Sequence, residues 1–292
     1  MKEIKIQWHP GFVAAINLEL AGNRDDLIYE KEYNLNTKPL EIDLLIIKKD
    51  SHVCIKNEIG WLFRGHNILE FRSPKDHLDI DSFYKASAYA CLYKAYGETV
   101  DERKANDITI SIVRESNPDG LFHYFKDHKI PISNPYPGIY YVLNEVLFPT
   151  QIIVTRKLDG ENHKWLKALS DKLKKQEMAA LLKNIKSLSQ KFDKELADAV
   201  LEVSVKANSQ VVEELKGDEA MCQALLEIME PEINKIVGLA KEEANRMANK
   251  EAEETAVKLI QSQKFSFEEI HQCVPRLTIK DIQKIAAGLA NV

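Results

Sequence analysis

The chain has 292 residues, of which 45% are hydrophobic and 29% charged, and its formal net charge is −5. This length and composition allow one sizeable core and a second module. The negative net charge argues against a protein that binds nucleic acid with its whole surface, so any such contact needs a local basic patch. No stretch approaches the roughly 18 apolar residues that a membrane helix requires, which argues against a transmembrane protein.

The cysteines and the N-terminus indicate a cytoplasmic protein. Cys54, Cys91, Cys222 and Cys273 lie far apart and form no Cys-x-x-Cys pair, so we expect reduced thiols. The first residues, MKEIKI, lack the apolar run of a signal peptide.

In chain order, the first half mixes strands with helices. Apolar residues at helical spacing predict a first helix over about 11–20. Alternating or continuous apolar runs then predict strands at 27–35, 41–48, 53–59, 67–71, 107–114, 139–143 and 151–156. Two helices are expected between them, at 81–96 and 121–128, and the second ends at a turn over 135–138, where the sequence is PYPG.

From about residue 161 onward the pattern is helical. A long amphipathic helix is predicted over 220–263, packed in a bundle or pairing two copies of the chain. Two short helices follow, opening on the capping-box patterns Ser266 to Glu269 and Thr278 to Asp281. They form either a hairpin that covers the long helix or a helix-turn-helix with Lys280 against phosphate. The predicted regions are 1–158, an α/β domain, then 159–218 and 219–292, both helical.

The chemistry is concentrated in two acid-bearing strands. Asp43 interrupts the apolar run at 41–48, and Glu70 and Arg72 share one face of the strand at 67–72 because side chains alternate. An acid inside an apolar strand is costly unless it has a partner, and two such acids on neighbouring strands form a divalent-metal site. Taken from these residues alone, a solvated ion pair between Glu70 and Arg72 on an edge strand is the favoured interpretation.

Longer runs of sequence resemble a known family. The runs are WHPGF at 8–12, PLEIDLLIIKK at 39–49, GHNILEFRSP at 65–74, DSFYKASAYACLYK at 81–94 and PGIYY at 137–141. They resemble the recombination-promoting nuclease/putative transposase family of the PD-(D/E)XK nuclease superfamily. The resemblance spans most of the chain and implies a restriction-endonuclease-like core, a mixed sheet flanked by helices, followed by an all-helical C-terminal region.

The resemblance also implies roles for individual residues. Asp43 and Glu70 are expected to bind Mg²⁺, with Mn²⁺ as a substitute, and Glu19 on the first helix is expected to be a further metal ligand. The alternative for Glu19 is a solvated helix residue. Tyr84 is expected beside the active site, on the helix that packs over the strands.

Arg72 stands where the superfamily usually has lysine. A guanidinium stays charged and tends to bind a carboxylate with two hydrogen bonds, whereas a lysine is a compact donor. Arg72 is therefore expected either to stabilise the phosphate in the transition state or to hold Glu70 in an ion pair that disfavours metal. A third possibility is that the missing lysine is supplied from elsewhere, by Lys48, Lys49 or Lys85.

The resemblance implies a Mg²⁺-dependent DNA endonuclease, linked to DNA recombination or mobile elements. The helical tail is expected to organise a homodimer or to bind the duplex, since cutting both strands is simplest with two active sites. The sequence leaves two alternatives open. One is a catalytically degenerate DNA-binding or interaction protein that keeps the nuclease fold, which Arg72 favours. The other is a phage-defence or toxin nuclease.

Overall fold

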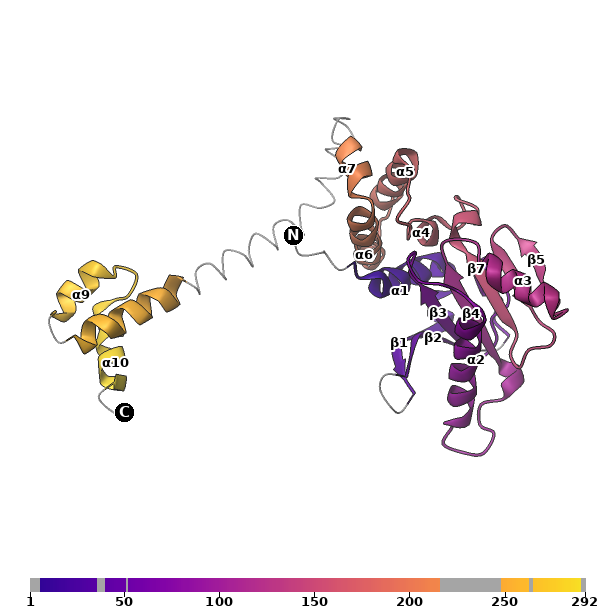
Figure 1. The fold of residues 1–292 in the computed structure, drawn as a ribbon, viewed down its shortest axis with the longest axis horizontal. Coiled ribbons are helices and arrows are strands. Elements are labelled where there is room, and N and C mark those ends of the chain that lie inside the picture. The colour runs from indigo at the N-terminus through magenta and orange to yellow at the C-terminus, as the bar shows by residue number, and fades with distance from the viewer. Residues whose placement is uncertain (1–5, 36–39, 51, 216–247, 263–264, 290–292) are drawn as a thin grey trace. The chain divides into compact units, whose positions relative to one another are not determined.

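The computed structural model describes residues 6–35, 40–50, 52–215, 248–262 and 265–289 (Figure 1). The chain divides into two compact units, residues 1–225 and 226–292. In its described part, the first unit is a seven-stranded mixed sheet with helices packed against it, and the described residues of the second are largely helical. The predicted α/β class, with further helices toward the C-terminus, is confirmed at this level.

The sheet has the strand order β1-β2-β3-β4-β7-β6-β5. Strands β3, β4 and β7 are mutually parallel at its centre, and the remaining neighbours pair antiparallel. The strands are β1 (Leu27–Asn34), β2 (Glu41–Lys48), β3 (His66–Arg72), β4 (Ile108–Arg114), β5 (Ser133–Tyr136), β6 (Ile139–Val142) and β7 (Thr150–Val154). The parallel centre places the carboxyl ends of β3, β4 and β7 at one edge of the sheet, where α/β proteins commonly bind ligands.

The helices of the first unit cover both faces of this sheet. They are α1 (Trp8–Glu19), α2 (Ile80–Ala95), α3 (Asp119–Asp127), α4 (Lys164–Lys167), α5 (Lys175–Lys186), α6 (Lys191–Ala207) and α7 (Ser209–Leu215). Ile68 and Ile112 point to one face, where α2 and α3 bury Phe83, Ala86 and Phe125 against them. These side chains form the main core.

The opposite face is covered by α1. Phe71 points to that face and stacks on Phe12 of α1, with the ring centroids 4.9 Å apart. Helix α1 packs in turn against α4 and α6 (Figure 1). The helical region predicted for 159–218 therefore lies, over its described residues, in the same compact unit as the sheet.

The predicted strand at 53–59 is wrong. Lys56 donates its backbone N–H to the side chain of Asn23, and the Asn57 side chain accepts from the N–H of Ile59. These local hydrogen bonds hold a turn and the short 3₁₀ helix Glu58–Gly60 in place of a ladder. Strand β5 was not predicted; its residues extend into the expected turn and pair with β6.

Within the second unit, three helical segments surround a small core. Residues 248–261 are helical and pack through Ala252 and Ala256 against α9 (Phe267–Cys273) and α10 (Ile279–Leu289). Both capping boxes are formed: Ser266 and Glu269 cap each other, and Thr278 and Asp281 do the same. The packing agrees with a hairpin that covers a helix. Most of the long helix predicted for 220–263 lies outside the described residues.

Across the described parts of the chain, no helix combines the length and apolar character needed to cross a membrane.

Candidate functional site

Asp43 and Glu70 meet where two strands of the sheet separate. The antiparallel ladder between β2 and β3 ends at the pair Leu44 and Leu69, so Asp43 and Glu70 are the next pair along, with side chains on the same face. Beyond the ladder, the Asp43 carboxylate accepts the Phe71 N–H at 2.8 Å, and the Asp43 N–H lies 3.4 Å from Oε1 of Glu70. The predicted pairing of the two acids across neighbouring strands is therefore present.

Glu70 is the more buried of the two, with 4% of its surface exposed. Burial, together with the nearby Asp43 charge, raises the pKa of Glu70 to about 8. The positive charges of Arg72 and Lys85 act in the opposite direction. A carboxyl group in this position is stabilised by a cation, because a cation offsets both the desolvation and the repulsion from Asp43.

His9, which had no predicted role, lies against Asp43. Its Nε2 is 3.2 Å from Oδ1 of Asp43, and this hydrogen bond is the main reason that the pKa of His9 is raised, with smaller contributions from Glu70 and Glu32. Glu32 occupies the β1 position across from Asp43 and has a left-handed backbone, with φ of 48°. The WHPGF run contained His9, but only the fold shows that the start of α1 reaches Asp43.

Arg72 does not pair with Glu70 in the structure. Its Nε and Nη2 atoms are buried and have no hydrogen-bond partner among the described residues. Of the two roles predicted for Arg72, the ion pair with Glu70 is therefore not the arrangement observed. The guanidinium therefore has N–H donors without acceptors, on the face of β3 that also carries Glu70.

Glu19 lies at the other end of α1, where its carboxylate accepts hydrogen bonds from the backbone of α4. It is ten residues from His9, which is about 15 Å along a helix. Its Oε1 accepts the N–H groups of Trp165 and Leu166 at the start of α4, and its Oε2 faces the buried His163 at 3.5 Å. The structure does not bring Glu19 to Asp43 and Glu70, and its alternative as a solvated residue is also wrong because Glu19 is buried.

Tyr84 lies on α2 with its side chain at the surface. It is 57% exposed, and its hydroxyl group hydrogen-bonds Tyr124 of α3. Tyr89 of the same helix is buried in the core, and Nζ of Lys85 lies 5.5 Å from the centre of its ring.

Among the three lysines considered as substitutes, Lys85 is the one whose charge reaches Glu70. Lys49 donates its Nζ to the carbonyl oxygen of Asp25 at 2.7 Å, and Lys48 alternates to the face opposite Asp43. A replacement lysine, if the chemistry needs one, is therefore Lys85.

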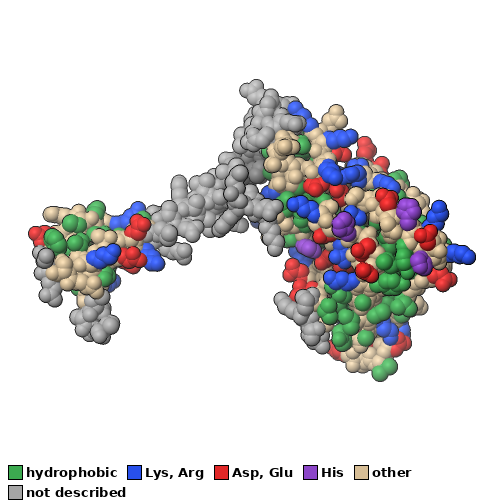
Figure 2. Space-filling model, in the orientation of Figure 1, with side chains coloured by type: hydrophobic (Ala, Val, Ile, Leu, Met, Phe, Trp, Pro, Cys, Tyr) green, Lys and Arg blue, Asp and Glu red, His purple; other side chains and the backbone are tan. Residues whose placement is uncertain are grey.

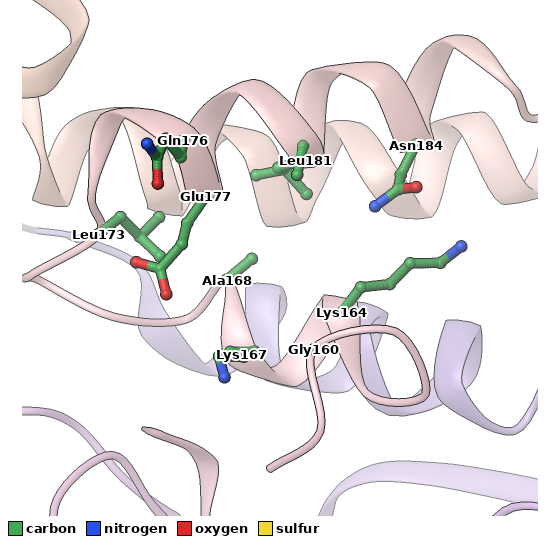
Figure 3. Close-up of a pocket in the computed structure, with 10 residues that line it drawn as sticks. Gly160, Lys164, Lys167, Ala168, Leu173, Gln176, Glu177, Leu181 and Asn184 are labelled. Carbon is green, nitrogen blue, oxygen red and sulfur yellow. The ribbon is translucent and has the colours of Figure 1, made fainter. Parts of the chain in front are cut away.

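A basic surface lies over α4, α5 and the segments before them. Between residues 156 and 186 the chain has nine Lys and Arg residues against four Asp and Glu residues. Figure 2 shows Lys and Arg side chains, interspersed with acidic ones, over this part of the unit. A cleft of about 290 Å³ lies between α4 and α5, bordered by Lys164, Lys167, Glu177 and Asn184 (Figure 3). We call this region the α4–α5 basic surface.

The carboxyl groups where β2 and β3 separate suit a hard divalent cation. Mg²⁺ is commonly held by one or two carboxylates, with water and substrate phosphate completing its shell, and Asp43 and Glu70 supply two carboxylates. No group of three or more His, Cys, Asp or Glu side chains placed for metal binding occurs in the described residues. A cation held by these two carboxylates would take the rest of its ligands from water or from a bound phosphate.

Compared with known proteins, the chain matches no family model, no curated protein and no solved structure.

Proposed function

We propose that the chain is a Mg²⁺-dependent DNA endonuclease whose first unit has a PD-(D/E)XK nuclease-like fold. The observation that carries the proposal is the pair Asp43 and Glu70 at the fork of β2 and β3, with Glu70 buried and its pKa raised. A pair of carboxyl groups, one of them buried, is costly to keep without a cation, and phosphodiester hydrolysis is the reaction that such a cation supports in the family that the sequence resembles.

In this proposal each residue has a distinct task. Asp43 and Glu70 hold Mg²⁺, which when bound polarises the phosphate and makes water a better nucleophile. Arg72 donates to the negative oxygens of the phosphate as charge develops. His9 donates to Oδ1 of Asp43 and fixes the orientation of that carboxylate.

The α4–α5 basic surface supports DNA as the substrate. The whole chain carries a net charge of −5, so general electrostatic attraction to DNA is absent. A local excess of lysines provides the phosphate contacts that orient a duplex without reading its sequence. Two active sites in a homodimer would cut both strands, and a role in recombination or mobile elements, in the cytoplasm, belongs to the same proposal.

The second candidate is a degenerate nuclease that binds DNA without cutting it. Arg72 in the lysine position is the observation that favours it, because arginine cannot shift its pKa to share a proton with water. Because Nε and Nη2 of Arg72 have no hydrogen-bond partner in the described residues, Glu70 is not tied up by them and is available for metal, which favours the active form.

The deciding experiment is nicking of supercoiled plasmid with Mg²⁺ or Mn²⁺. We expect the wild-type protein to nick, Asp43→Ala to be inactive, and Asp101→Ala, an exposed acid in the loop after α2, to behave as wild type. Inactive wild type with activity gained in Arg72→Lys would establish the degenerate form. Inactivity of all variants, with no rise of Tm on addition of Mn²⁺, would refute the metal site itself.

A further inference from the structure

Two arginines lie side by side at the carboxyl edge of the parallel strands. Arg72 ends β3 and Arg114 ends β4, and they are direct partners in the parallel register. Partners in a parallel ladder point to the same face, which here is also the face of Glu70. Two like charges about 5 Å apart at their backbones repel each other, so an opposite charge is needed between or above them.

No ion pair among the described residues provides that opposite charge. Nε and Nη2 of Arg72 and Nε of Arg114 are buried and have no hydrogen-bond partner in the described residues. Buried donors without acceptors are uncommon, because each costs the hydration it has lost. Neither guanidinium is paired with a carboxylate in the described part of the chain.

The neighbouring acids are engaged elsewhere. Glu115 follows Arg114 but pairs with Arg156 and with the hydroxyl group of Ser170. Asp79 is close enough for Arg72 to lower its pKa, yet its carboxylate accepts the N–H of Ser82 at the start of α2. These two acids therefore form no ion pair with either guanidinium group.

We propose that Arg72 and Arg114 together form a binding site for a phosphoryl group. Guanidinium groups match phosphate because their N–H donors are arranged in a rigid fork, and a pair of them neutralises a doubly charged oxyanion. The site adjoins Glu70, so a bound phosphate lies next to the carboxyl pair. The further claim, that this phosphate is a phosphodiester of nucleic acid, rests on the proposed function, and Arg114 is then a substrate-positioning residue that the sequence did not reveal.

The test is thermal unfolding without metal, in EDTA, with inorganic phosphate compared with chloride at equal ionic strength. We expect phosphate to raise the Tm of the wild type and to lose this effect in Arg114→Met. Without phosphate, Arg114→Met should be as stable as the wild type or more stable, because a buried unpaired donor has been removed. Arg64→Gln, in the turn before β3 and so at the other end of that strand from Arg72, should keep the phosphate effect.

A full phosphate effect in Arg114→Met, or an equal effect of chloride in the wild type, would overturn the proposal. Should Arg114→Met fail to fold, Arg114→Lys provides the same test: it keeps the charge but loses the fork, and should weaken phosphate binding by about tenfold. Unchanged phosphate binding in Arg114→Lys would count against the site.

A second experiment tests whether the phosphoryl group that binds this site belongs to DNA. A short DNA duplex added in EDTA should displace inorganic phosphate from the wild type, and Arg114→Met should bind that duplex about tenfold more weakly or worse. Failure of DNA to displace phosphate would overturn the nucleic-acid part of the inference. Binding of phosphate and DNA in EDTA without nicking in Mg²⁺ would sustain the arginine site and refute the proposed nuclease.

Discussion

At the scale of single residues, the site is defined by a carboxyl group held where water cannot stabilise its charge. Glu70 is buried by the sheet and α2 and lies beside Asp43, and both circumstances favour its protonated form. In the proposed metal site, a proton and a cation therefore compete for Glu70. A site of this kind takes up its cation more readily as the pH rises.

The first prediction concerns the pH dependence of stability. Glu70 binds its proton more tightly when folded, with a pKa of about 8 against 4.5. The stabilisation from this proton is complete below about pH 4.5 and is lost as the pH rises toward 8. In metal-free buffer the wild type should thus lose on the order of a few kcal/mol relative to Glu70→Gln over that range. Urea unfolding at several pH values measures it.

The control for this prediction is Glu98→Gln, an exposed glutamate. It should follow the wild type at every pH. Parallel curves for wild type and Glu70→Gln would show that Glu70 is ionised in the folded protein across the range.

At the scale of elements, the strands were predicted well where a run of apolar residues or their alternation was sufficient. The apolar run at 41–48 gave β2 with its exact bounds, and alternation gave the face of Asp43. The positions of Glu19, His9 and Arg114 depend on which elements become neighbours in space. That information is tertiary, and no local pattern contains it.

The failures have the same origin. The stretch 53–59 has enough apolar residues for a strand, but hydrogen bonds from Asn23, thirty-odd residues away, hold its backbone in a turn. Glu19 has the residue type of a metal ligand, yet α4 needs an acceptor for its first N–H groups and Glu19 is within reach.

The second prediction tests this role of Glu19. Helix α4 has only four residues, so its amides depend on Glu19 for acceptors. Glu19→Ala should lower the unfolding free energy by about 1–3 kcal/mol. Glu19→Gln, which keeps an acceptor oxygen, should lose less, as measured by urea unfolding. Nicking by the folded protein should persist in both variants; loss of Mn²⁺ binding in Glu19→Gln would restore its role as a metal ligand.

The third prediction concerns the hairpin of β5 and β6. Gly138 has φ of 77°, and a Cβ atom there would lie 2.7 Å from the carbonyl oxygen of Val154. Gly138→Ala should therefore lower the unfolding free energy by about 1–3 kcal/mol. Gly22→Ala is the matched control, since its Cβ would meet no atom within 4 Å, and it should leave Tm nearly unchanged. Equal Tm values for the two variants would contradict the strain at Gly138.

At the scale of the whole molecule, charge is distributed unevenly. The chain is acidic overall, but the α4–α5 basic surface carries more than twice as many basic as acidic residues. Such a distribution confines attraction for a polyanion to one region and repels it from the rest. A duplex would then approach in a limited set of orientations.

The fourth prediction follows from this distribution. The double variant Lys164→Glu, Lys167→Glu should bind a DNA duplex more weakly than the wild type, as measured by fluorescence anisotropy. The slope of log K against log salt concentration should also fall by about 2, because each phosphate contact contributes about 0.9. Lys126→Glu, on the exposed side of α3, should have little effect. An unchanged slope in the double variant would place the DNA contacts on another surface.

The ending of the β2–β3 ladder at Leu44 and Leu69 has a consequence for how this site tolerates change. Strand register, and not the number of residues between Asp43 and Glu70, determines how close the two carboxyl groups are. Extra residues in the exposed turn near Asp50 would leave the pair intact, since loop length costs little free energy. One residue inserted between Asp43 and Leu44 would instead turn Asp43 to the α1 face while Leu44 kept its partner, and the two acids would no longer meet.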